Sequence, residues 1–137
     1  MAYLLDTNVL SELRKGARGD PRVRRWAKET VRERHYLSVL SLGEIRKGIE
    51  ILRRKAPDQC PVFERWLARL ETDYENDILP VGEAVADRWG CLMAVRSLPV
   101  IDGLLAATAL EHRLTVVTRN TDDFEGTGVD LLNPFAG

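Results

Sequence analysis

The sequence of 137 residues lacks any segment that could cross a membrane, because its longest apolar stretch, near residues 104–110, is far shorter than the ~20 residues needed. The opening M-A-Y-L-L-D lacks the basic and apolar regions of a signal peptide. Cysteine is scarce: Cys60 and Cys91 are isolated and form no C-x-x-C pair. These absences predict a cytoplasmic protein with reduced thiols and no membrane partner.

Several chemical motifs are also missing. The sequence has no phosphate-binding G-x-G-x-x-G loop, no P-loop and no nucleophilic triad, and His35 and His112 lack the H-x-x-x-H spacing of a zinc site. It contains no internal repeat and no low-complexity linker. With 45% hydrophobic and 30% charged residues, the composition is typical of one globular domain that covers residues 1–137.

Charge is distributed unevenly although the net charge is only -1. Residues 14–55 hold 14 of the 20 basic residues and five of the 21 acidic ones. Such a basic segment can attract phosphate or an acidic partner, but solvated helix faces would give the same distribution. Charge alone therefore leaves both interpretations open.

Apolar stretches alternate between two types along the chain. Short runs predict strands at 3–5, 36–40, 78–81, 114–118 and 129–132. Apolar positions three and four apart predict helices at 8–15, 21–34, 41–55, 62–75, 83–96 and 103–113, with Asp20 as the N-cap of the second. Strands separated by helices pair in parallel, so the expected fold is α/β: a single three-layer α/β/α sandwich with a parallel sheet of four to five strands.

Acidic residues occur where ligands bind in such folds, outside the carboxyl ends of the strands. Asp6 directly follows the first predicted strand, and Asp122 and Asp123 come soon after the fourth. Glu44 is expected in the first turn of the helix after the second strand, and Asp102 at the start of the helix before the fourth. We expect these carboxylates to converge on one edge of the sheet.

Each acid taken singly has a structural explanation. These are a local turn at Asp6, an S-x-x-E capping box at 41–44, an N-cap at Asp102 and an exposed turn at 122–123. Together they favour function, because converging carboxylates repel one another unless a cation neutralises them. Oxygen ligands of this kind suit Mg²⁺ or Mn²⁺.

Four segments carry a family resemblance. They are L-L-D-T-N-V-L-S-E-L at 4–13, S-L-G-E-I-R-K-G-I at 41–49, L-P-V-I-D-G-L-L-A-A-T-A-L at 98–110 and T-R-N-T-D-D-F at 118–124. In this order they resemble the PIN-domain toxins of the VapC/FitB branch, and the G-V-D-L-L-N-P-F ending extends the resemblance over essentially the whole chain. The resemblance implies a single PIN domain over 1–137 that acts as a metal-dependent endoribonuclease, the toxin of a toxin–antitoxin pair.

The resemblance also implies the site. Asp6, Glu44 and Asp102 match the family's metal-binding, catalytic acids. Many PIN domains have a fourth acid where this chain has Asn120, so we assign the fourth acid to Asp123, with Asp122 as the weaker candidate. The supporting residues are then Thr7, Asn8, Thr118 and Asn120.

The expected partners follow from the same family. They are an RNA substrate, a cognate antitoxin on a separate chain and a second copy of this chain, so that a homodimer assembles into a toxin–antitoxin complex. Basic side chains near the acids could hold the phosphates that flank the cleaved bond, although each could instead be a solvent-facing helix charge. The candidate RNA-binding residues are Arg14, Lys15, Arg46, Lys47 and Arg119.

Three alternatives to the nuclease can be weighed on the sequence. A PIN domain that has lost catalysis and only binds is kept open by Asn120. A receiver-type signalling domain is a poorer match, because it needs an acid pair after the first strand and a lysine after the fifth. Here Asp6 stands alone and no lysine follows Lys55. A haloacid-dehalogenase-type phosphatase would need a second acid where Asn8 stands.

Overall fold

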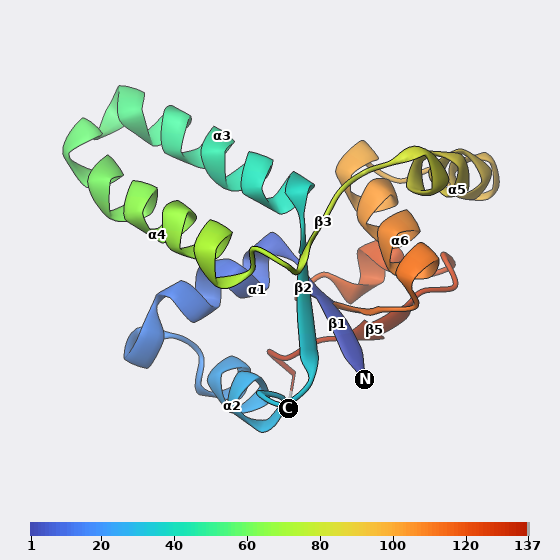
Figure 1. Cartoon of the computed structure of the whole chain (residues 1–137), viewed down its shortest axis with the longest axis horizontal. Coiled ribbons are helices and arrows are strands. Elements are labelled where there is room, and N and C mark those ends of the chain that lie inside the picture. Colours follow the sequence, from blue (N-terminus) through green and yellow to red (C-terminus); the bar gives the residue numbers. More distant parts are fainter. Residues whose placement is uncertain (137) are drawn as a thin grey trace.

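A five-stranded, wholly parallel sheet forms the centre of the molecule (Figure 1). The computed structural model describes residues 1–136. The strands are β1 (Ala2–Leu5), β2 (Arg34–Ser38), β3 (Ile78–Leu79), β4 (Thr115–Val117) and β5 (Asp130–Leu132), in the order β3-β2-β1-β4-β5. Leu4 in the central strand is in register with Tyr36 on one side and Val116 on the other. The predicted parallel sheet is confirmed.

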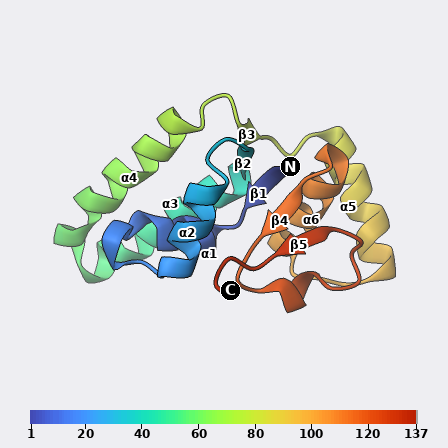
Figure 2. The same ribbon diagram turned by 90° about the horizontal axis from the view of Figure 1, so that it is seen from below.

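Helices cover both faces of the sheet, which confirms the three-layer prediction (Figures 1 and 2). One face packs against α1 (Thr7–Arg14), α2 (Pro21–Glu29), α3 (Val39–Lys55) and α4 (Cys60–Asp73). The other packs against α5 (Glu83–Val95) and α6 (Val100–His112). Three short 3-10 helices complete the chain: η1 (Gly16–Arg18), η2 (Pro57–Gln59) and η3 (Thr121–Phe124).

The alternation of side chains along β1 divides the core between these two layers. Tyr3 and Leu5 point into the cluster formed with α1 to α4, whereas Leu4 points into the cluster formed with α6 and η3. Phe124 of η3 is buried in this second cluster. The central strand is therefore covered on both sides, and its carboxyl end at Asp6 is held in a fixed place.

The second predicted helix is shorter than expected. It ends at Glu29 and does not reach residue 34, because Thr30 terminates it: the Thr30 hydroxyl donates to the Trp26 carbonyl at 2.9 Å. Arg34 instead begins β2. The predicted N-cap is confirmed, since the Asp20 side chain accepts the Arg22 N–H.

The junction between β2 and α3 also differs from the prediction. The strand ends at Ser38, whose side chain accepts the Leu40 N–H at 3.0 Å and caps α3. Val39 and Leu40 are therefore helical, and the S-x-x-E capping box at 41–44 does not form. Glu44 consequently lies in the second turn of α3, where we expected the first.

The helix α6 begins three residues earlier than predicted, with Pro99 at its N-cap position. Asp102 is thus in the first turn and is not the N-cap. Gly103 allows α5 and α6 to approach closely, because a Cβ atom there would lie 2.8 Å from the Met93 sulfur. Within residues 1–136 no single helix is long and apolar enough to span a membrane; α5 and α6 meet the test only as a pair bent by 118°.

Candidate active site

Asp6 occupies the carboxyl end of the central strand. Its backbone N–H donates to the Val117 carbonyl at 2.9 Å, and its Oδ1 accepts the Thr7 N–H at 2.8 Å, which makes Asp6 the N-cap of α1. The residue is only 8% exposed. Burial raises the pKa of Asp6, the hydrogen bonds from Thr118 and Thr7 lower it, and the charge of Asp123 raises it further.

The Thr118 hydroxyl, which contacts this carboxylate, has all of its hydrogen-bonding positions occupied. It donates to Asp6 Oδ2 at 2.9 Å and accepts N–H groups from Asn8 Nδ2 at 3.2 Å and the Asn120 backbone at 3.1 Å. A hydroxyl has one proton and two lone pairs, so these three partners use it completely. Its proton is therefore directed at Asp6, which favours the ionised carboxylate.

Asn8 connects the first turn of α1 to the loop after β4. Besides its contact with Thr118, Nδ2 lies 3.4 Å from Asp6 Oδ2, and Oδ1 accepts the Arg119 N–H at 3.1 Å. One carboxamide thus fixes the loop that leads to Asn120 and Asp123 relative to Asp6.

Glu44 is held from the neighbouring helix. The Thr7 hydroxyl donates to Glu44 Oε1 at 2.7 Å, a contact that joins α1 to α3. Glu44 itself is exposed at the edge of the sheet. Thr7, which follows Asp6 in the chain, therefore ties the Glu44 carboxylate of α3 to the start of α1.

Asp102 reaches the same edge from α6. Burial raises its pKa most, followed by the charges of Asp6, Asp123 and Glu44. Because all three charges act on it, the Asp102 carboxyl lies within electrostatic range of Asp6, Asp123 and Glu44. Asp122 is not among these charges. The two neighbours differ because η3 turns around Phe124, which is buried next to Asp123.

The donor set consists of oxygen alone. His35 stacks on Trp26 at 5.2 Å within α2 and β2, and His112 ends α6, so neither joins the carboxylates. Within the described residues 1–136, no three acidic, histidine or cysteine side chains stand close enough together to hold an ion as they are placed. The donor chemistry fits a hard divalent cation.

The comparisons with known proteins identify the family to which this fold belongs. The family model described as PIN domain matches residues 3–129. The chain belongs to the PIN-domain family. Toxin FitB of Neisseria gonorrhoeae is 32% identical, over 96% of this chain and 97% of the relative. VapC ribonuclease Y4jK of Sinorhizobium fredii is 33% identical, over 96% of each chain.

A solved relative shows the same architecture over its full length. The crystal structure of FitAcB from Neisseria gonorrhoeae superposes with a TM-score of 0.80 and 31% identity, covering 98% of this chain and 99% of that one. The structure of FitAB bound to the IR36 DNA fragment gives 0.71 and 30% identity, over 97% and 95%. This PIN domain therefore resembles the VapC/FitB branch over its whole length.

Two of the basic residues predicted to bind RNA are engaged in ion pairs in this PIN domain. Lys15 contacts Glu12 at 3.0 Å. Arg46 contacts Glu50 at 3.0 Å and also pairs with Glu64 across the α3–α4 hairpin. These cations are partly neutralised by their neighbours.

The other three have different surroundings. The Arg14 guanidinium lies 4.5 Å from the centre of the Phe63 ring, and the Arg119 guanidinium lies 4.1 Å from the Phe135 ring. Lys47 lines a hollow beside α3. None of the three makes an ion pair within residues 1–136. The aromatic partners of Arg14 and Arg119 could not be predicted, because each ring lies in another element of the chain than its arginine.

Proposed function

We propose that this PIN domain is a metal-dependent endoribonuclease and the toxin of a toxin–antitoxin pair. The observation that supports it most directly is the convergence of acids on Asp102 at the carboxyl edge of the sheet, where the charges of Asp6, Asp123 and Glu44 all act on its carboxyl group. A full-length relative is named a VapC ribonuclease. The cytoplasm, where RNA is available, is the compartment we propose.

The four carboxylates would hold Mg²⁺ or Mn²⁺. When bound, the ion supplies an acidified water and neutralises charge on the phosphate oxygens. The Thr118 hydroxyl lowers the pKa of Asp6 against the effect of burial, and Thr7 orients Glu44. Asp102 is the group whose ionisation is least favoured by its neighbours, so it gains most when a cation arrives.

The proposal is tested with a fluorophore-labelled RNA that reports cleavage. We expect cleavage with Mg²⁺ or Mn²⁺, its loss in EDTA and its return when excess metal is added. Asp6→Asn and Asp102→Asn should each lower the rate by at least about a hundredfold, since each removes a proposed ligand. Cleavage that continues unchanged in excess EDTA contradicts the proposal. A wild-type protein that binds metal and RNA without cleaving RNA would instead be the catalytically impaired binding module.

The fourth acid is tested by a matched pair of variants in the same turn. Asp123→Asn should weaken Mn²⁺ binding and slow cleavage, because the Asp123 charge acts on Asp6 and Asp102. Asp122→Asn removes the same charge one residue away and should change little. Asn120→Asp tests the position that many relatives use. If Asp123→Asn keeps the Mn²⁺ affinity and the cleavage rate of the wild type, Asp123 is not part of the metal site.

The proposed protein partner is an antitoxin. Two solved relatives are titled as FitAcB and FitAB, and another is titled a toxin–antitoxin complex from Klebsiella pneumoniae. We expect the product of a small neighbouring gene to co-purify with this chain and to suppress RNA cleavage. Full cleavage in the presence of that product would contradict the pairing.

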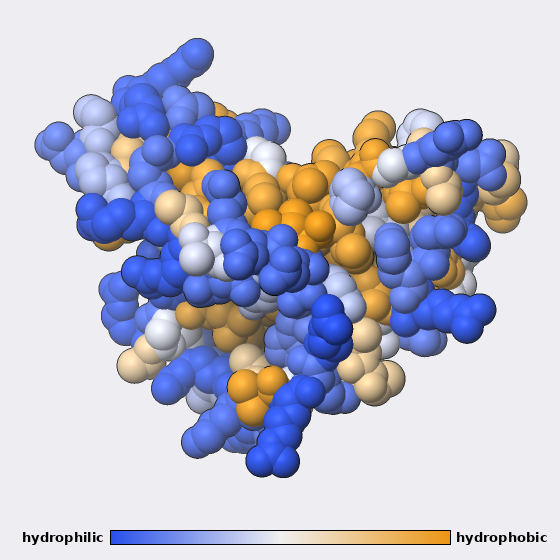
Figure 3. Space-filling view, viewed as in Figure 1, coloured by the Kyte–Doolittle hydropathy of each residue, from blue (hydrophilic) through white to orange (hydrophobic). Residues whose placement is uncertain are grey.

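A second copy of the chain is the other proposed partner. A hollow of about 560 Å³ lies between α3 and the start of α6, and exposed aliphatic residues surround it: Val39, Ile51 and Val100 are 40%, 47% and 59% exposed. Figure 3 shows this apolar surface gathered between α3 and the α5–α6 side of the molecule. Light scattering should give a dimer at micromolar concentration, and Ile51→Lys should give a monomer. A wild-type monomer contradicts the dimer.

A further inference from the structure

A second cavity opens beside the acidic edge, between α1, α3 and α4. It has a volume of about 310 Å³, within the ~300–1,000 Å³ of small-ligand sites. Its walls are mostly apolar, with the Phe63 and Trp66 rings from α4 and the Ser11 hydroxyl from α1. Thr7 and Glu44 form the end nearest the acids, and they share the 2.7 Å hydrogen bond. Anything bound in this cavity therefore lies next to a proposed metal ligand.

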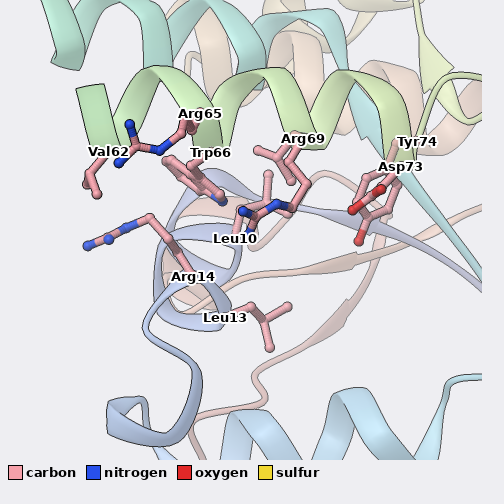
Figure 4. A pocket seen from close by; sticks show the side chains of 10 residues that line it. Leu10, Leu13, Arg14, Val62, Arg65, Trp66, Arg69, Asp73 and Tyr74 are labelled. Atoms are coloured by element: carbon pink, nitrogen blue, oxygen red, sulfur yellow. The ribbon is translucent and has the colours of Figure 1, made fainter. Parts of the chain in front are cut away.

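A basic groove continues from this cavity along α1 and α4. Trp66 lines both, and the groove adds Arg14, Arg65 and Arg69 (Figure 4). These three arginines make no ion pair within the described part of the chain, residues 1–136. Asp73 is the acidic residue of the groove and lies at its far end, near Tyr74 (Figure 4).

Arg14 stands where the groove and the cavity meet. Its guanidinium lies 4.5 Å from the Phe63 ring centre and 5.7 Å from that of Trp66. Stacking on a ring uses the face of the guanidinium, so its N–H donors at the rim stay free for a phosphate. The two aromatic rings and the cation thus form one unit, which offers a base a stacking surface and its phosphate a charge.

We propose that this cavity is a nucleobase subsite, in which one unstacked base of a single-stranded RNA binds against Phe63 and Trp66. The neighbouring phosphates lie on Arg14 and on Arg65 and Arg69 of the groove, and the strand runs from there to the acidic edge. The subsite gives the enzyme a local preference for the base beside the cleaved bond. This inference rests on the proposed ribonuclease function.

Charge and apolar surface together match a single-stranded RNA. The groove offers three arginines to successive phosphates, and the cavity offers two aromatic rings to an uncharged base. The phosphate that follows the base would then lie beside the acids, where the proposed cation would neutralise its charge. A single strand is required, because a base paired in a duplex cannot leave its stack without a cost of a few kcal/mol.

The test narrows the cavity without replacing an acid. Gly48 lines the cavity, and a Cβ atom there would meet nothing within 4 Å, so Gly48→Leu adds bulk without a backbone clash. Because Gly48 also lines the hollow proposed for the dimer, light scattering must show the same oligomeric state for Gly48→Leu as for the wild type. Gly90 of α5 offers a matched control, since it is also helical with open space around its Cβ, on the opposite face of the sheet. Both substitutions replace glycine in a helix and should raise helix stability equally.

Binding is measured in EDTA by the anisotropy of a labelled single-stranded RNA pentamer. We expect Gly48→Leu to weaken binding at least about tenfold, since stacking of one base is worth ~1–3 kcal/mol, whereas Gly90→Leu should bind as the wild type does. Arg14→Gln should weaken binding and reduce its salt dependence by about one phosphate contact. With Mn²⁺, Gly48→Leu should cleave with an altered base preference while its Mn²⁺ affinity stays unchanged.

Equal RNA binding and equal cleavage preference in the two leucine variants would overturn the subsite. It is also overturned if Gly48→Leu leaves RNA binding intact and only prevents an antitoxin from suppressing cleavage, because the cavity would then be a protein-docking site. The binding measurement needs no cleavage. Absence of cleavage by the wild type would therefore contradict the ribonuclease proposal, and the pentamer titration would still decide on the cavity.

Discussion

Removing the Thr118 hydroxyl should lower the free energy of unfolding, because the hydroxyl makes three hydrogen bonds, although its removal changes the volume of the side chain little. Thr118→Val keeps the shape of the side chain but deletes the proton donated to Asp6 Oδ2 and the oxygen that accepts from Asn8 and Asn120. Thr118 is fully buried, so water cannot replace the hydroxyl without rearrangement. Thr118→Ser is the control, because it keeps all three hydrogen bonds and loses only a methyl group.

The magnitude follows from the partners that are left behind. A buried polar group that loses its partner costs ~1–3 kcal/mol, and bonds to a charged group lie at the upper end. The Asn120 N–H is on an exposed residue and can bind water, so most of the cost falls on Asp6 and Asn8. We expect Thr118→Val to lower the free energy of unfolding by about 2–3 kcal/mol, and Thr118→Ser by about 1 kcal/mol for the lost methyl group.

Urea denaturation of the metal-free protein as a function of pH measures this difference. Burial already raises the pKa of Asp6, and the Thr118 hydroxyl opposes that rise. A carboxyl group with a raised pKa in the folded state costs stability as pH rises through that pKa. Thr118→Val should therefore have a lower free energy of unfolding than Thr118→Ser, and this difference should be largest at neutral pH and shrink in acid, where Asp6 is protonated. A difference that is absent, or equal at all pH values, would refute the reasoning.

Three further predictions follow from the same structure. Asp102→Asn should raise the melting temperature in EDTA by a few degrees at pH 7 and not in acid, because burial and three neighbouring carboxylates raise the pKa of Asp102. A large drop in melting temperature would instead show that Asp102 has a structural role. Burial lowers the pKa of His35 below 6.5, so His35 binds its proton more readily in the unfolded chain, and the free energy of unfolding should fall as pH drops below about 6.5. His35→Gln should make the free energy of unfolding depend less on pH in this range, as measured by urea denaturation. Phe124→Ala should cost about 3–5 kcal/mol in urea denaturation, because the ring is 1% exposed, and it should weaken Mn²⁺ binding by releasing η3.

The sheet was predictable because its signals are local. Each strand is a short apolar run, and the alternation of strands with helices leaves parallel pairing as the simple topology. Asp6 and Asp102 could be placed near the edge because they stand next to these runs or at the start of a helix. The boundary errors occurred where two local signals compete. At the start of α3, both Ser38 and Ser41 can cap; Ser38 accepts the Leu40 N–H, whereas the equally buried Ser41 hydroxyl has no hydrogen-bond partner within residues 1–136.

The surroundings of the basic residues were not predictable, because they depend on contacts between elements. Arg46 finds Glu64 only when α3 and α4 pack as a hairpin, and Arg14 finds Phe63 only when α1 packs beneath α4. In the sequence, all the arginines of residues 14–55 look alike. Their packing divides them into those that carboxylates neutralise and those that keep their charge for a ligand.

The same packing explains how the fold keeps carboxylates together before any cation binds. Burial and then the neighbouring charges raise the pKa of Asp102, and burial also raises that of Asp6, whereas the hydrogen bonds that Asp6 accepts from Thr118 and Thr7 lower its pKa. These donors come from the start of α1 and the end of β4, and both positions are fixed by the pairing of β1 with β4. A sheet slipped by one residue would turn Asp6 away from Thr118, so the register of the two central strands sets the ionisation of the acidic edge.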